Sequence, residues 1–158
     1  MPAAAFTPAT TIVASDAANT SGRRRMWAVG AVAGVVSSLV VIALVALAKG
    51  AGVPMEVAEN STKQPEQIPL PGYAVVILGS TLVGLLLATA FGLTGRPRLA
   101  FVITALVLTA VSFAFPATTT ATTATKVMLE ITHLIPAALI IAAIAAHLPS
   151  RRVRGTVA

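Results

Sequence analysis

Two ionisable side chains inside an apolar run are the clearest candidates for chemistry in this sequence. Glu130 and His133 are three residues apart within the run 127–148, so a helix would place them as neighbours on one face. Pro136 has no backbone N–H, which would free the carbonyl of Thr132 just beyond them. Ionisable residues at membrane depth commonly mark substrate, proton or lipid sites. We therefore take Glu130 and His133 as the candidate polar membrane site.

The same two residues have a simpler interpretation, as an anchor at the edge of the membrane. If the helix begins on the outer side, Glu130 lies in its first turns, where the helix dipole favours an acid and Lys126 can pair with it. We prefer this anchoring interpretation, and the functional one stays open. His147 is one residue before Leu148 and Pro149, which indicates the inner headgroup boundary.

Other catalytic or cofactor chemistry finds little support in the sequence. There is no cysteine, which excludes disulfides and thiolate metal sites. The only aspartate is Asp16, which lies in the N-terminal tail. His133 and His147 would be about 21 Å apart on one helix, so one chain cannot hold a haem between them. We expect a protein that is not an enzyme and that has no catalytic, cofactor or metal site.

The composition predicts a protein whose solvent is lipid. Of the 158 residues, 56% are hydrophobic and only 10% are charged, whereas soluble domains carry about 25% charged residues. The mean hydropathy is +0.89. A net charge of +6 would suggest nucleic acid in a soluble protein, but here the basic residues cluster at the ends of the apolar runs. We therefore expect the lipid bilayer as the partner and no nucleic acid.

Four apolar segments are candidate transmembrane helices. A span needs about 20 residues, with about 17 to 25 tolerated. The first segment has 23 residues without a charge, which is longer than the apolar part of a cleaved signal, so we expect it to be retained. The prediction is an all-α membrane bundle of four transmembrane helices. The predicted spans are 26–48, 73–93, 99–115 and 127–148.

The basic residues predict the orientation, because short basic loops stay in the cytoplasm. The N-terminal flank, the 94–98 turn and the C-terminal tail hold eight basic residues, whereas the 49–72 and 116–126 loops hold three. Both termini should therefore be cytoplasmic. The predicted organisation is a disordered cytoplasmic tail (1–24), a transmembrane domain (25–149) and a basic cytoplasmic tail (150–158). The expected location is the bacterial inner (plasma) membrane, as a multi-pass protein.

Rows of small residues predict where the helices touch. In lipid, helices associate by close packing, so small residues four apart mark contact faces. We expect packing within the bundle, with a homodimer seam as the alternative. The predicted packing residues are Gly30 and Gly34 in the first span, and Ser80, Gly84 and Ala88 in the second.

Four short stretches together resemble a known group of sequences. They are Trp27 at the start of the first span, GVPMEV at 52–57, GSTL at 79–82 and HLIP at 133–136. Their combination resembles an uncharacterised family of actinobacterial four-span membrane proteins, described as a domain of unknown function. The resemblance covers about residues 25–148 and implies no activity, substrate or cofactor.

The sequence leaves two functional hypotheses. The first is a non-enzymatic structural or accessory protein of the cell envelope, with other membrane proteins or a second copy as partners. The second is a small transport or permeation component that acts as an oligomer and uses the face of Glu130 and His133. The chain shows none of the paired helix interruptions that mark a transporter site at the membrane midplane.

Overall fold

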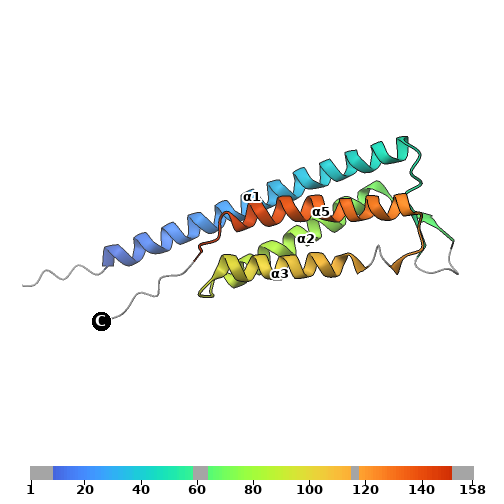
Figure 1. Ribbon diagram of the computed structural model, residues 1–158. Helices are drawn as coiled ribbons and strands as arrows, with labels where there is room; N and C mark the ends of the chain where they lie inside the picture. The colour runs from blue at the N-terminus through green and yellow to red at the C-terminus, as the bar shows by residue number, and fades with distance from the viewer. Residues whose placement is uncertain (1–8, 59–63, 115–117, 151–158) are drawn as a thin grey trace, which may run out of the picture.

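The computed structural model describes residues 9–58, 64–114 and 118–150, most of which are helical. The helices lie side by side and alternate in direction along the chain, and Figure 1 shows the first and last described residues toward the same end. The predicted helical fold class is confirmed. The elements in chain order are α1 (Ala9–Gly50), β1 (Glu56–Val57), β2 (Glu66–Gln67), α2 (Leu70–Phe91), α3 (Pro97–Ser112) and α5 (Thr123–Ala145).

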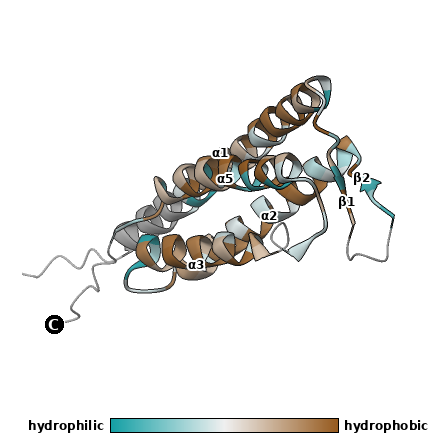
Figure 2. Ribbon diagram, turned by 45° about the vertical axis from the view of Figure 1, so that its right-hand side comes forward, coloured by the Kyte–Doolittle hydropathy of each residue, from teal (hydrophilic) through white to brown (hydrophobic). Residues whose placement is uncertain are grey.

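Three of the described helices are long and apolar enough to cross a membrane. They are Thr20–Gly50 within α1, together with α2 and α5. Figure 2 shows that most of their residues are hydrophobic, whereas β2 and the turn between α2 and α3 are hydrophilic. α3 has 16 residues, which corresponds to about 24 Å against a hydrocarbon core of about 30 Å. α3 begins two residues before the predicted span 99–115 and ends at Ser112, three residues before the end of that span. Residue 115 of the predicted span lies outside the described residues.

α1 is much longer than its predicted span of 26–48. It begins at Ala9 and has 42 residues, so part of the segment expected to be a disordered tail over 1–24 is helical. Residues 9–24 contain no proline and several alanines, and such a segment can continue a helix that the apolar part nucleates.

Local backbone chemistry explains where the helices begin and end. Two residues after the end of α1, Gly52 adopts a φ of 88°, which suits glycine. The N–H groups of Gly52 and Val53 donate to the carbonyls of Lys49 and Ala48 at 3.0 Å each. α2 and α3 carry proline within their first two positions, where the backbone N–H has no partner inside the helix. At the start of α5, the Thr122 hydroxyl accepts from the backbone N–H of Thr125 at 3.2 Å.

The tightest packing lies where α1 meets α2 and α5. A Cβ on Gly30 would be 2.6 Å from Cδ2 of Leu85 on α2 and 3.3 Å from Cγ1 of Ile144 on α5. A Cβ on Gly34 would be 2.7 Å from Oγ1 of Thr81. The absence of side chains at these two positions lets the helix backbones approach closely.

The predicted small-residue row of α2 lies in two different environments. Ala88 is fully buried, whereas Ser80 is exposed and Gly84 is half-buried. A Cβ on Gly84 would meet only Cδ1 of Ile144, at an ordinary 3.6 Å. The buried face of α2 is instead formed by Tyr73, Ile77, Thr81, Leu85 and Ala88.

A short hairpin closes the end of the bundle away from the termini. β1 and β2 pair in antiparallel register, with Glu56 opposite Gln67. Ala58 and Thr120 exchange two backbone hydrogen bonds of 3.0 and 3.1 Å. The bridge fastens the α1–α2 connection to the segment before α5, so this end is tied together by backbone hydrogen bonds.

The contact at Gly34 generates a prediction on stability. Gly34→Leu should lower the free energy of unfolding by about 1–3 kcal/mol, because the new side chain overlaps Thr81 and forces two helices apart. The measurement is thermal unfolding of the purified chain in detergent. Gly79→Leu is the matched control, since a Cβ at Gly79 has no atom within 4 Å. Equal stability of the two variants would contradict the close approach of α1 and α2.

Candidate functional site

A cavity of about 780 Å³ lies between α2, α3 and α5. Its volume falls within the roughly 300–1,000 Å³ of small-molecule sites. Most of its lining is apolar, and the described residues that line it include no Asp, Glu, Lys or Arg. The arrangement suits an uncharged or apolar occupant.

The exposure of the lining residues shows where the cavity opens. Val75 and Val76 on α2 are 71% and 62% exposed, and Leu108 on α3 is 49% exposed. The lining residues of α5 are buried or half-buried, as Leu129 and Pro136 illustrate. The cavity therefore has α5 as its floor and opens sideways between α2 and α3.

The two ends of the cavity are covered by side chains. Val57 of β1 and Ile68, just after β2, line it at the hairpin end. Phe101, one turn into α3 and 1% exposed, lines it at the opposite end. An occupant would therefore enter from the side rather than along the bundle axis.

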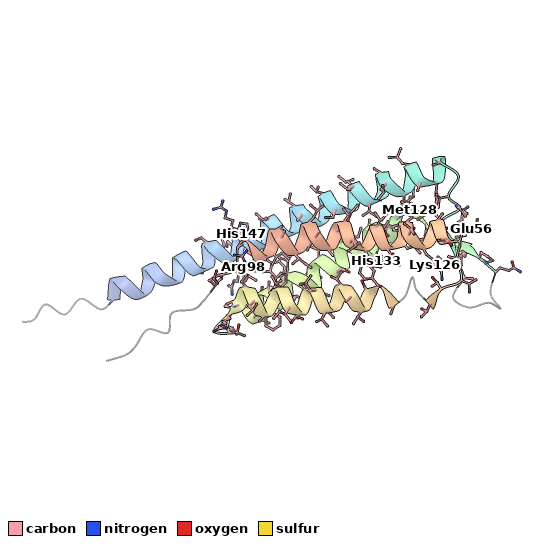
Figure 3. The ribbon with its side chains drawn as sticks, in the orientation of Figure 1. Glu56, Arg98, Lys126, Met128, His133 and His147 are labelled. Carbon is pink, nitrogen blue, oxygen red and sulfur yellow. The ribbon has the colours of Figure 1, made fainter. Side chains whose placement is uncertain are left out.

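His133 is one of the polar groups in this lining. It is half-buried, and its ring lies 6.3 Å from the ring of Phe113, just beyond α3. Its Nδ1 is 2.7 Å from the carbonyl oxygen of Leu129. A carbonyl can only accept, so Nδ1 carries the proton and Nε2 of the neutral ring is left as an acceptor. Figure 3 labels His133 between α5 and α3.

The structure separates the two residues of the predicted polar site. Glu130 is exposed and is not among the residues that line the cavity, whereas His133 lines it. The two residues are three positions apart, so their side chains differ in direction by about 60° around the helix axis. This difference suffices to place one toward the cavity and the other away from it. No described contact joins Glu130 to His133.

His147 lies at the other end of α5, near Arg98 in Figure 3. Its Nδ1 is 2.9 Å from the carbonyl oxygen of Ala143, and the side chain is half-buried. The described residues contain no group of three His, Cys, Asp or Glu side chains that could hold a metal ion.

Tyr73 is the site residue that sequence reasoning missed. It lies in the first turn of α2, lines the cavity and is only 8% exposed. Its hydroxyl is buried and has no hydrogen-bond partner among the described residues. Such orphaned polar groups are rare in folded proteins and invite an explanation. As the sole tyrosine of the chain, at the edge of an apolar run, it could have been taken only for an interfacial anchor.

The register of the helices places Tyr73 and His133 at a similar depth. Gly84 of α2 lies beside Ile144 of α5, and α2 and α5 run in the same direction in Figure 1. Tyr73 and His133 each lie 11 residues before these contact positions. At the same rise per residue, both are about 16 Å from that contact. The two side chains therefore line the cavity at one level, toward the hairpin end.

Three other polar side chains of the lining have hydrogen-bond partners. The hydroxyl groups of Thr109, Ser112 and Thr132 donate to backbone carbonyls at 2.6–2.8 Å. Beyond the level of Tyr73, the lining is mostly apolar, with Leu87, Phe101 and Ile140, and Ser80 there is exposed. The cavity thus has a polar end near the hairpin and an apolar end near the α2–α3 turn.

Comparison with known proteins places the chain in a family. No curated protein matches it, and no solved structure matches it. The model of a family of unknown function, DUF6069, matches residues 21–150, which include every helix that contributes to the cavity. The chain therefore belongs to the DUF6069 family of unknown function.

Proposed function

We propose that this chain is a four-span protein of the bacterial cell membrane that acts without catalysis, by holding an apolar molecule of the bilayer in the cavity between α2, α3 and α5. In this role it is an accessory protein of the envelope. The observation that carries the proposal is the uncharged, mostly apolar cavity with its lateral opening. Such an opening faces lipid when the helices span a bilayer.

The direction of the helices supports four crossings. α2 and α5 are both long enough to cross, and they run in the same direction. Two successive crossings in one direction require the chain to return between them. α3 runs the opposite way and occupies that part of the chain. Although it is short, α3 provides this return in our proposal.

The distribution of basic residues supports cytoplasmic termini. The backbone N–H of Arg98 donates to the carbonyl of Pro149 at 3.4 Å, so the start of α3 and the end of α5 lie together. Five described arginines gather at this end, and Lys49 and Lys126 lie at the hairpin end. The positive-inside rule assigns the arginine-rich end to the cytoplasm. Those arginines are Arg23, Arg24, Arg25, Arg96 and Arg98.

The alternative, a permeation component that acts as an oligomer, has less support. A path for a polar solute needs polar groups along its length, but the lining of this cavity is mostly apolar, and Val57 and Phe101 cover its two ends. The predicted dimer seam at Gly30 and Gly34 is occupied by α2 and α5 of the same chain. These contacts favour the binding role over an oligomeric pore.

The proposed topology predicts which positions are reachable from outside the cell. The chain has no cysteine, so single cysteines can be placed at the exposed positions Gln64, Gly95 and Ser150. A membrane-impermeant maleimide should label only Gln64→Cys in intact cells, and all three after permeabilisation. Labelling of Ser150→Cys in intact cells would refute cytoplasmic termini.

The proposed binding role predicts that filling the cavity displaces its occupant. Gly79 lines the cavity, and a Cβ there has no atom within 4 Å, so Gly79→Phe adds a ring without a backbone clash. The purified variant should carry several-fold less co-purified lipid than the wild type, as measured by native mass spectrometry in mild detergent.

The matched control is Ala90→Phe, on the same helix at an exposed position outside the lining. It should keep the lipid content of the wild type, because its ring points to the surrounding lipid. If the wild type and both variants carry the same lipid, the cavity is not a binding site and the proposal fails.

A further inference from the structure

We propose that the occupant of the cavity is a neutral glycerolipid of the outer leaflet, held by hydrogen bonds of its hydroxyl and ester carbonyl to His133 and Tyr73. This inference rests on the proposed function and specifies its ligand. The occupant's polar end would lie at the level of Tyr73 and His133, and its acyl chain would fill the apolar end.

The first support is the hydroxyl group of Tyr73. It is buried without a partner among the described residues, and the residue that carries it lines the cavity. In lipid no water is available to satisfy it, so a buried donor of this kind gains from a ligand acceptor. The ester carbonyl of a glycerolipid is such an acceptor.

The second support is the unused nitrogen of His133. The hydrogen bond of Nδ1 to Leu129 leaves Nε2 as an acceptor. No described hydrogen bond uses Nε2. A ligand that also satisfies this atom must carry a donor, and a glycerol hydroxyl is an uncharged donor close to the ester carbonyl. The equal depth of Tyr73 and His133 suits two adjacent groups of one molecule.

The third support is the charge of the lining. No Lys or Arg lines the cavity within the described residues, so a phosphate placed beside His133 would lack a cation. On α5, the nearest described cation is Lys126, two turns before His133 toward the hairpin end. A charged head drawn into this uncharged site would be desolvated without a partner. The site therefore favours a neutral head.

The fourth support is the shape of the cavity relative to the proposed topology. Its polar end lies toward the hairpin, which is outside in the proposed orientation, and its apolar end points toward the cytoplasm. A lipid of the outer leaflet has its head and chain in this same order. The lateral opening between α2 and α3 would admit the chain directly from the bilayer.

The test uses the full chain, delipidated in detergent and titrated with three probes of similar chain length. The probes are monooleoylglycerol, which has a neutral head, lysophosphatidylglycerol, which is anionic, and octadecene, which has no head. Native mass spectrometry gives the dissociation constants. We expect monooleoylglycerol to bind most tightly to the wild type.

Two variants test the polar anchors while keeping a ring at each position. Tyr73→Phe and His133→Phe should each weaken monooleoylglycerol binding by roughly 3- to 10-fold, the effect of one hydrogen bond, and should leave octadecene binding unchanged. Thr104→Val is the control, because it removes a half-buried hydroxyl of α3 outside the lining. Its affinity for monooleoylglycerol should match that of the wild type.

Thermal unfolding without lipid separates loss of binding from loss of fold. Tyr73→Phe should be as stable as the wild type or more stable, since it removes a buried hydroxyl that has no partner. The ligand assignment is overturned if both anchor variants bind monooleoylglycerol like the wild type, or if lysophosphatidylglycerol binds more tightly. In either case, retained octadecene binding leaves the proposed function standing. If none of the three probes binds, the proposed function falls as well.

Discussion

The rest of the structure depends on the close approach of α1 to α2 and α5 at Gly30 and Gly34. In the bilayer location that we propose, apolar side chains gain little by leaving lipid, so helices must be held by close contact. The two glycines permit that contact by leaving space for Leu85, Thr81 and Ile144. α2 and α5 therefore each pack one side against α1. On their other side they meet α3 less closely, and the cavity occupies the space that remains.

Much of the fold could be predicted from the sequence, because hydropathy reports the length of apolar segments directly. α2 and α5 lie within a few residues of the predicted spans. The extent of α1 was underestimated, since its first residues are polar and hydropathy does not distinguish a polar helix from a polar tail. The end of α3 at Ser112 was also missed, because apolar residues continue beyond the point where the helix stops.

The site was less predictable, because it depends on how the helices are rotated about their axes. The spacing of Glu130 and His133 placed them on adjacent positions of one face, but only packing against α3 decides which of them lines the cavity. Ser80 and Ala88 were assigned to one row, yet one is exposed and the other is buried. The role of Tyr73 could not be predicted, because a missing hydrogen-bond partner is a property of the folded surroundings.

The bridge between Ala58 and Thr120 has a consequence for the order of assembly. Its two halves are separated by α2 and α3, so it forms only after both helices have been synthesised. Gly30 likewise contacts Ile144, near the end of α5. Chains emerge from the ribosome N-terminus first, so α1 and α2 can pack together early. α5, which forms the floor of the cavity, is synthesised last. In the bilayer location that we propose, the site is thus completed late in biogenesis, when the lipids that would supply its occupant already surround the chain.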